Sequence, residues 1–230
     1  MIKKFLNYFT KLEKILWFSS ATLIVVSFFM FDRGNYLTLF ASLIGVTSLI
    51  FNAKGNPFGQ FLMVLFSVLY GIISYSFSYY GEMITYLGMT MPMAIFALIS
   101  WLKNPYNNRK SQVKVNTISK TETAFMLILT VFITIIFYFI LKYFNTANLF
   151  FSTLSVSTSF IAAYLTFRRN PYFALAYAAN DVVLIILWIM ASLTKISYIS
   201  VVICFVVFLF NDLYGFFSWL KMQKKQKLIK

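Results

Sequence analysis

A similar apolar unit occurs twice along the chain, and this repeat constrains the fold more than any other feature of the sequence. Each copy has three apolar stretches, with an Asn-Pro step between the first and the second (Asn56-Pro57 and Asn170-Pro171). Each copy closes on Ser-Trp-Leu-Lys, and the proline lies 44 residues before the tryptophan in one copy and 48 in the other. The spacings differ by about one helical turn, so the sequence predicts two related helical halves.

Composition indicates that both halves lie in a lipid bilayer. Apolar residues make up 60% of the chain and charged residues 11%, and a soluble domain of this size could not bury so much apolar surface. The net charge of +14 comes from short segments between the apolar runs, not from one basic face. We therefore expect an integral membrane protein without a nucleic-acid partner.

The sequence lacks the residues that most enzymes and metal sites need. It has no histidine and one cysteine, Cys204, so an intrachain disulfide is impossible and a Cys/His metal site is excluded. A nucleophile–histidine pair and a glycine-rich phosphate loop are absent as well. We predict a protein that is not an enzyme, with no catalytic residue, no metal and no cofactor.

Eight apolar segments are long enough to cross a bilayer, which takes about 20 residues each. The predicted spans are Ile15–Phe31, Tyr36–Ala53, Phe58–Tyr80, Met83–Leu102, Glu122–Tyr143, Asn148–Phe167, Tyr172–Leu193 and Ile196–Leu220. The connections are short except for the polar, basic loop Lys103–Thr121. Ser119 and Glu122 have the spacing of a capping box at the start of the fifth span.

Basic residues predict the orientation because they favour the cytoplasmic side. With the N-terminus inside, every Lys and Arg except Arg33, Lys142 and Lys195 lies on the inner side. We therefore expect a multi-pass cell-membrane protein with both termini in the cytoplasm. The first span resembles a signal peptide in length and basic flank, but no small-residue cleavage site follows it, so we expect it to be retained.

We predict an all-α integral membrane protein with a seven-helix core, in which a linker helix joins two parallel three-helix bundles, plus one N-terminal helix. The bundles are expected to be parallel because one span, Glu122–Tyr143, separates them. Such repeats are typical of transporters, in which two bundles move around a shared site. The expected divisions are residues 1–35 (basic segment and extra helix), 36–104 (first bundle), 105–146 (loop and linker helix), 147–223 (second bundle) and 224–230 (basic tail).

Two acids lie well inside the predicted spans, in the pairs Asn180-Asp181 and Asn211-Asp212. At about 1.5 Å per residue, Asp181 is about 18 Å and Asp212 about 13–14 Å from the inner edge, near the middle of a core about 30 Å thick. Charges at this depth are costly and usually functional. We expect the pairs to face a shared substrate site; the alternative is that they hydrogen-bond helices together.

Aromatic residues distinguish the two copies. The first copy lacks acids at the equivalent positions and has Pro92, which we expect to kink its helix, and the tyrosines Tyr70, Tyr75 and Tyr86. Trp188 lies two turns after Asp181 on the same helical face, where it suits either stacking on a planar ring or anchoring at the outer interface. Near the inner ends an aromatic belt is expected, formed by Trp17, Trp101 and Trp219.

Five segments closely resemble the PnuC-type nicotinamide riboside transporters: Ala53–Gly59, Tyr79–Met89, Leu165–Pro171, Ala176–Asp181 and Asn211–Leu220. The resemblance extends from Tyr36 onward and includes the three-plus-one-plus-three layout, similar to that of the SWEET sugar transporters. It implies facilitated diffusion of an unphosphorylated, nucleoside-like vitamin, which a cytoplasmic kinase then traps. Related members carry thiamine or riboflavin, and these stay open as alternatives.

The chemistry of nicotinamide riboside suits the candidate residues. Its flat cationic ring favours an aromatic face and tolerates a carboxylate, although thiamine is an aromatic cation too. The candidate substrate-binding residues are Asn180, Asp181, Trp188, Asn211, Asp212, Tyr214, Gln60, Tyr70 and Tyr86. The aspartates also suit proton-coupled uptake, and a non-transporting membrane scaffold is a further alternative. Assembly into a homo-oligomer is left open.

Overall fold

The computed structural model describes residues 8–76 and 80–228. Within this part, eight helical spans are long and apolar enough to cross a membrane, as predicted. They are α2 (Lys11–Phe31), α3 (Tyr36–Ala53), α4 (Pro57–Ser76), the continuous run of α5 (Tyr80–Thr85), η1 (Tyr86–Thr90) and α6 (Met91–Lys103), α7 (Lys120–Tyr143), α8 (Leu149–Phe167), α9 (Tyr172–Ser192), and α10 (Ile199–Leu228), which follows the short η2 (Ile196–Tyr198). Residues 77–79 of the predicted third span, and Lys3, Lys4 and Lys230 of the predicted inner charge, lie outside the described residues.

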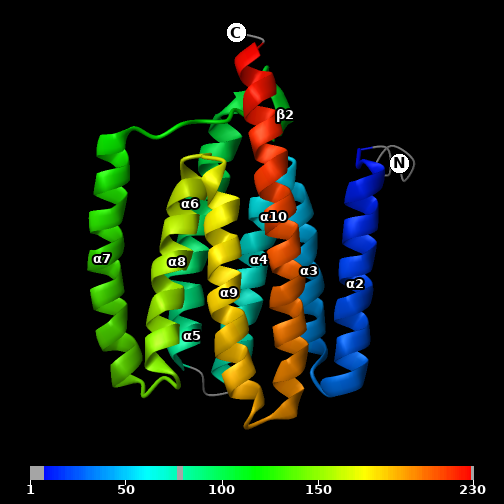
Figure 1. Ribbon diagram of the computed structural model, residues 1–230, viewed down its shortest axis with the longest axis vertical. Coiled ribbons are helices and arrows are strands. Elements are labelled where there is room, and N and C mark those ends of the chain that lie inside the picture. The colour runs from blue at the N-terminus through cyan, green and yellow to red at the C-terminus, as the bar shows by residue number, and fades with distance from the viewer. Residues whose placement is uncertain (1–7, 77–79, 229–230) are drawn as a thin grey trace.

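Two groups of three helices form the body of the molecule. Helix α4 packs against α3 and α6, and helix α9 packs against α8 and α10. Figure 1 shows α3 and α8 running in the same direction, with α7 at one edge and α2 at the other. This arrangement is consistent with two parallel bundles, a linker helix and an added N-terminal helix. The start of α2 and the end of α10 lie on the same side (Figure 1), which we call the terminal side.

The repeated Asn-Pro step has the same backbone role in both halves. The residue before each asparagine adopts a left-handed conformation, with φ of 65° at Gly55 and 57° at Arg169. The side-chain oxygens of Asn56 and Asn170 each accept a hydrogen bond from the backbone N–H two residues later, at 3.0 Å. The proline that follows each asparagine stands at the start of the next helix, as the first residue of α4 and as the N-cap of α9, where its missing N–H costs no helical hydrogen bond.

The predicted loop between α6 and α7 contains ordered structure. It forms an antiparallel hairpin of two strands, β1 (Pro105–Tyr106) and β2 (Arg109–Val113). Residues 113–116, which we call the strap, then cross the terminal side. The N–H of Val113 donates to the carbonyl of Gly55, and the N–H of Asn116 donates to the carbonyl of Arg169, both at 2.9 Å. The strap therefore bonds to the equivalent turn of each half.

Helix α10 is longer than predicted. It continues from the expected end at Leu220 to Leu228, so most of the basic tail expected at residues 224–230 is helical. Lys and Gln are good helix formers, and the side chain of Gln226 bonds to the carbonyl of Val113 (3.0 Å) and to the N–H of Val115 (2.8 Å). These bonds fix the extension of α10 against the hairpin.

Side-chain caps begin α2, α3 and α7. Ser119 accepts a hydrogen bond from the N–H of Glu122 (3.1 Å), as predicted for the start of α7. The carboxylate of Glu122 does not complete the capping box but pairs with Arg168 of the neighbouring turn. A complete capping box instead begins α2, between Thr10 and Glu13.

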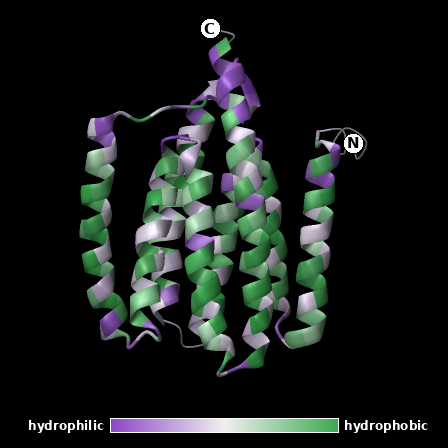
Figure 2. Cartoon of the chain, in the orientation of Figure 1, coloured by the Kyte–Doolittle hydropathy of each residue, from purple (hydrophilic) through white to green (hydrophobic). Residues whose placement is uncertain are grey.

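The outer surface of the bundle is apolar. Figure 2 shows apolar residues along the middle of the helices and polar residues gathered near both ends. On α7 the exposed large residues include Phe125, Ile128, Phe132, Ile135 and Phe139. Their spacing of three or four places them on one helical face, and a continuous apolar face of this kind suits contact with lipid chains.

Candidate functional site

The two aspartates predicted at mid-depth meet between α9 and α10. Asp181 is 4% exposed and Asp212 is 5% exposed, and their carboxyl groups lie close enough to interact electrostatically. Neither forms a salt bridge within the described residues, where the Oδ2 atom of Asp181 also has no hydrogen-bond partner. Two buried carboxylates repel each other, so a close pair of carboxyl groups favours sharing one proton and holding a single negative charge.

The two asparagines point away from this pair toward neighbouring helices. The Oδ1 atom of Asn180 accepts hydrogen bonds from Thr158 (2.8 Å) and Ser159 (3.0 Å) of α8. The amide of Asn211 donates to Ser20 of α2 (3.0 Å). Each Asn-Asp step therefore combines an asparagine that joins two helices with an acid that lies close to the other acid.

Aromatic rings of the first half lie beside the aspartates. Tyr70 and Tyr86 are buried, with ring centroids 4.6 Å apart, whereas Tyr75 is 62% exposed. Tyr86 interacts electrostatically with Asp181 across the boundary between the halves. Two of the three tyrosines singled out in the sequence therefore face the second half, as expected for a site between two bundles.

A local irregularity in the helix positions Tyr86. It begins η1, a π-helical segment that leads into Pro92 near the start of α6. The backbone stays helical through this region. The irregularity associated with Pro92, where we expected a kink, is the wider π-helical turn on its N-terminal side. Short π-helical segments are frequent at functional sites.

Trp188 lies in the half of the molecule opposite the terminal side and lines two cavities. It is 6% exposed, and its ring packs against Tyr198 with centroids 5.4 Å apart. The narrower cavity is also lined by Tyr70 and Asp32. The other cavity has a volume of about 240 Å³. The burial of Trp188 argues against an exposed interfacial anchor and favours a role within the protein.

Gln60 and Tyr214 lie away from the aspartate pair. The amide of Gln60 donates to the side-chain oxygen of Asn52 (2.9 Å), in the first turn of α4 near the terminal side. The hydroxyl of Tyr214 donates to Glu13 of α2 (3.1 Å). Gln60 is buried and Tyr214 is half-buried, and each joins two helices. The structure does not bring them together with the other candidate residues.

Another buried acid, Glu82, was missed in the sequence. It lies in α5 and is 7% exposed, and it interacts electrostatically with Tyr86. The predicted fourth span began at Met83, one residue too late to include it. The structure therefore corrects the expectation that acids within the membrane are confined to the second half. The span observed in the structure runs from Tyr80 to Lys103, with 24 residues. A predicted span of that length would have included Glu82.

The two Ser-Trp pairs close the terminal side in a crossed arrangement. Trp101 and Trp219 are fully buried, contrary to the aromatic belt predicted for them. The indole of Trp101 donates to the carbonyl of Thr166 at the end of α8 (2.9 Å), and that of Trp219 donates to the carbonyl of Asn52 at the end of α3 (2.7 Å). Each half thus adds a second donor to a helix-end carbonyl of the other half, which also accepts a backbone N–H from its own turn. We call these bonds the crossed latch.

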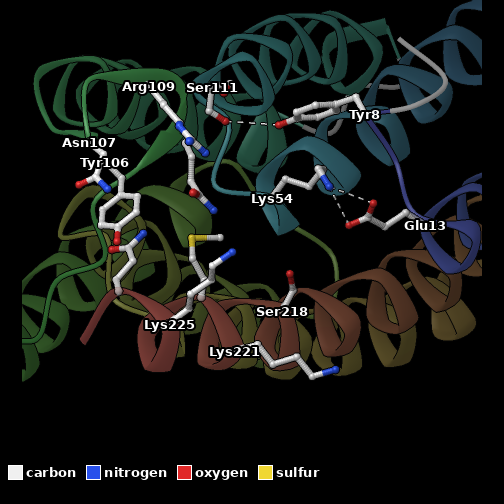
Figure 3. A pocket seen from close by; sticks show the side chains of 13 residues that line it. Tyr8, Glu13, Lys54, Tyr106, Asn107, Arg109, Ser111, Ser218, Lys221 and Lys225 are labelled. Carbon is white, nitrogen blue, oxygen red and sulfur yellow. Dashed lines mark hydrogen bonds and ion pairs between the residues drawn. The ribbon is translucent and has the colours of Figure 1, made fainter. Parts of the chain in front are cut away.

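A separate pocket of about 540 Å³ opens on the terminal side between α2, the hairpin and α10 (Figure 3). In it Lys54 pairs with Glu13 at 3.1 Å, and the hydroxyl of Tyr8, whose pKa is raised by burial, donates to the carbonyl of Ser111 (3.3 Å). The other cationic side chains that line it are Arg109, Lys221 and Lys225. This pocket is distinct from the mid-depth site.

Together, the eight apolar spans define a multi-pass membrane protein, and buried acids lie between its two helical groups. Residues 35–221 match the family described as nicotinamide mononucleotide transporter. Because this match covers more than half of the chain, the chain belongs to that family of membrane transporters.

Two relatives and one solved structure agree with this assignment. The nicotinamide riboside transporter PnuC of Neisseria mucosa is 24% identical over 202 residues, covering 86% of this chain and 76% of that protein. PnuC of Haemophilus influenzae is 19% identical over 215 residues, covering 92% and 91%. A crystal structure of the vitamin B3 transporter PnuC has the same fold, with a TM-score of 0.81 at 20% identity, over 95% of this chain and 94% of that one.

Proposed function

We propose that this chain carries nicotinamide riboside across the cell membrane by facilitated diffusion. The observation that carries the proposal is the contacting pair Asp181 and Asp212, buried beside Tyr86 and without a counter-ion in the described residues. A singly negative, aromatic-lined site complements a flat cation with one positive charge. The names of the two PnuC relatives support the same substrate.

The charge distribution favours the riboside over its mononucleotide. A phosphate group needs basic side chains or backbone N–H groups to bind it. The described Lys and Arg residues lie at helix ends and in connections, and Figure 2 shows polar residues concentrated there. A phosphate placed next to Asp181 would instead meet a like charge. We therefore expect the mononucleotide to be rejected.

The direction of net uptake follows from the orientation and from trapping. We propose that the terminal side faces the cytoplasm, because most basic residues lie there. A carrier that only equilibrates its substrate accumulates it when a cytoplasmic kinase phosphorylates the riboside, since the product is no longer a substrate. No ion gradient is then required.

Transport by purified protein in liposomes tests the proposal. Vesicles loaded with unlabelled nicotinamide riboside should take up labelled riboside by exchange, and excess external riboside should compete whereas the mononucleotide should not. Thiamine and riboflavin, measured in the same assay, test the alternative substrates. Exchange of either vitamin without exchange of the riboside would overturn the assignment of the substrate.

Proton-coupled uptake is the second candidate mechanism, because two contacting carboxyl groups can exchange a proton with the ligand or the solvent. The two mechanisms differ in the effect of a pH gradient. In the facilitated-diffusion mechanism, a pH gradient across the liposome membrane leaves the final internal concentration of riboside equal to the external one. Accumulation above the external concentration would favour proton coupling instead.

A further inference from the structure

Glu82 lies in a part of the molecule that the mid-depth site does not use. Glu82 is 7% exposed, and it has no salt-bridge partner among residues 8–76 and 80–228. Gly81 brings this turn close to the connection between α7 and α8, because a Cβ there would collide with Thr146 and Leu141. The close approach holds Glu82 against that connection.

Glu82 lines the cavity of about 240 Å³ on the side opposite the terminal side. The cavity opens between the connection that precedes α8 and the one that follows α9, and Trp188 forms part of its wall. The hydroxyl of Thr146 is buried and has no hydrogen-bond partner in the described part of the chain. The other polar residues of the wall are Asn148, Ser152 and Thr194.

This combination of groups is selective for one chemical class. The residues that line the cavity include a carboxylate, an indole, an amide and hydroxyls, and no lysine or arginine. A buried carboxylate beside an aromatic ring attracts an organic cation, whereas an anion would be repelled. Sites for whole ligands usually measure roughly 300–1,000 Å³, so a cavity of about 240 Å³ accommodates the ring of a nucleoside rather than the complete molecule.

The cavity is also connected to the mid-depth site by a shared side chain. Tyr86 interacts electrostatically with Glu82 on one side and with Asp181 on the other. Trp188 lies two helical turns from Asp181 on the same helix. Acidic and aromatic groups therefore follow one another from the cavity to the centre of the molecule.

We propose that Glu82 and Trp188 form an outer recognition site for the cationic aromatic ring of the substrate, occupied before the ring reaches Asp181 and Asp212. The inference rests on the proposed function, which supplies the cationic substrate. Glu82 acts as the residue that selects positive charge at the outer opening. Trp188 provides the face on which the ring stacks.

The first test compares a cation with its neutral counterpart on the purified full-length chain. Nicotinamide riboside carries the charge, and its reduced dihydropyridine form does not. Glu82→Gln keeps the size of the side chain and should weaken calorimetric binding of the cation about tenfold, while the affinity for the reduced form changes less than about twofold. Equal losses for both forms, or no loss for the cation, would overturn the proposal.

A control uses an acid that lines neither cavity at Trp188. Glu122→Gln removes a charge that pairs with Arg168 at the start of α7, so it should leave both affinities unchanged. A loss of cation affinity in Glu122→Gln as large as that in Glu82→Gln would mean that the general field of the protein attracts the ligand and would overturn a specific site.

A second variant keeps the test decisive if Glu82→Gln does not fold. Thr194 is exposed and lines the cavity, so Thr194→Lys places a positive charge at the opening with little effect on packing. It should weaken binding of the cation and spare the reduced form, and Thr194→Gln should affect neither. Identical behaviour of the two Thr194 variants would overturn the proposal. If the wild-type protein binds neither form, the proposed function itself fails. If the wild-type protein binds the cation and the variants do not behave as stated, only the outer recognition site fails.

Discussion

At the scale of single residues, the positions of the acids decide the chemistry of this protein. Asp181 and Asp212 contact each other in the second half, and Glu82 lies in the first half beside a separate cavity. Burial of unpaired carboxylates is costly, so a folded chain keeps them where a ligand or a shared proton compensates. The asparagine next to each aspartate has a different role, because its amide bonds to an adjacent helix.

We predict that replacing both aspartates, Asp181→Asn together with Asp212→Asn, weakens binding of nicotinamide riboside about tenfold, a change of about 1.4 kcal/mol. The double substitution keeps the shape and removes the negative charge, because in a single variant the remaining carboxyl can still ionise and hold it. The uncharged reduced riboside should lose less affinity than the cation. Isothermal titration of both ligands measures this, with Glu122→Gln as a control because Glu122 pairs with Arg168 at the helix ends. A neutral analogue that loses as much affinity as the cation contradicts charge pairing.

At the scale of helices and strands, equivalent residues of the two repeats make equivalent contacts between the halves. In each half the tryptophan of the closing helix donates to the last turn of the first helix of the other half. The indole rings of Trp101 and Trp219 lie 5.3 Å apart at the point where these bonds cross. The strap adds a backbone hydrogen bond to the equivalent turn of each half. These interactions hold the terminal side closed.

We predict that Trp219→Phe destabilises the closed terminal side. An aromatic ring is retained, but the carbonyl of Asn52 loses the indole donor and keeps only the N–H of Gly55 (2.9 Å), and the loss of one buried hydrogen bond costs about 0.5–1.5 kcal/mol. The midpoint of thermal denaturation in detergent should fall, and exchange of substrate in liposomes should become faster if opening of this side limits the rate. Trp17→Phe is the control, since its indole bonds to the hydroxyl of Thr47 at a half-buried position. A smaller change in Trp219→Phe than in this control would contradict the crossed latch.

At the scale of the whole molecule, two similar groups of three helices surround acids and aromatic rings contributed by both. The first half supplies Tyr70, Tyr86 and Glu82, and the second supplies Asp181, Asp212 and Trp188. This asymmetry within a symmetric scaffold suits a ligand whose two ends differ. Both described ends of the chain lie on the terminal side, where the basic residues are concentrated.

We predict that the terminal side faces the cytoplasm, and cysteine labelling measures this. Cys204 is buried, so the unmodified chain should not react with a membrane-impermeant maleimide in intact cells. Thr194→Cys should be labelled from outside, whereas Ser111→Cys in the hairpin should be labelled only after the membrane is opened. The reverse pattern would show that the orientation inferred from the basic residues is wrong.

Much of the architecture follows from the sequence alone. Eight apolar runs, separated by short connections, specify eight membrane-length helices because a backbone in lipid must satisfy its own hydrogen bonds. The Asn-Pro steps and the closing Ser-Trp-Leu-Lys segments reveal the repeat, and the depth of Asp181 and Asp212 follows from counting residues along a helix. These features depend on local composition and on fixed helical geometry, so the chain determines them without reference to its partners in space.

The tertiary structure alone decided which polar residues share a site. Trp101 and Trp219 look like interfacial residues along the chain, but the other half provides carbonyls that bury them. Gln60 and Tyr214 bond to neighbouring helices near the terminal side, and Glu82 enters a cavity because α5 extends the helix beyond its apolar run. Such partners are set by the packing of helices far apart in sequence, and periodicity along one helix carries no information about them.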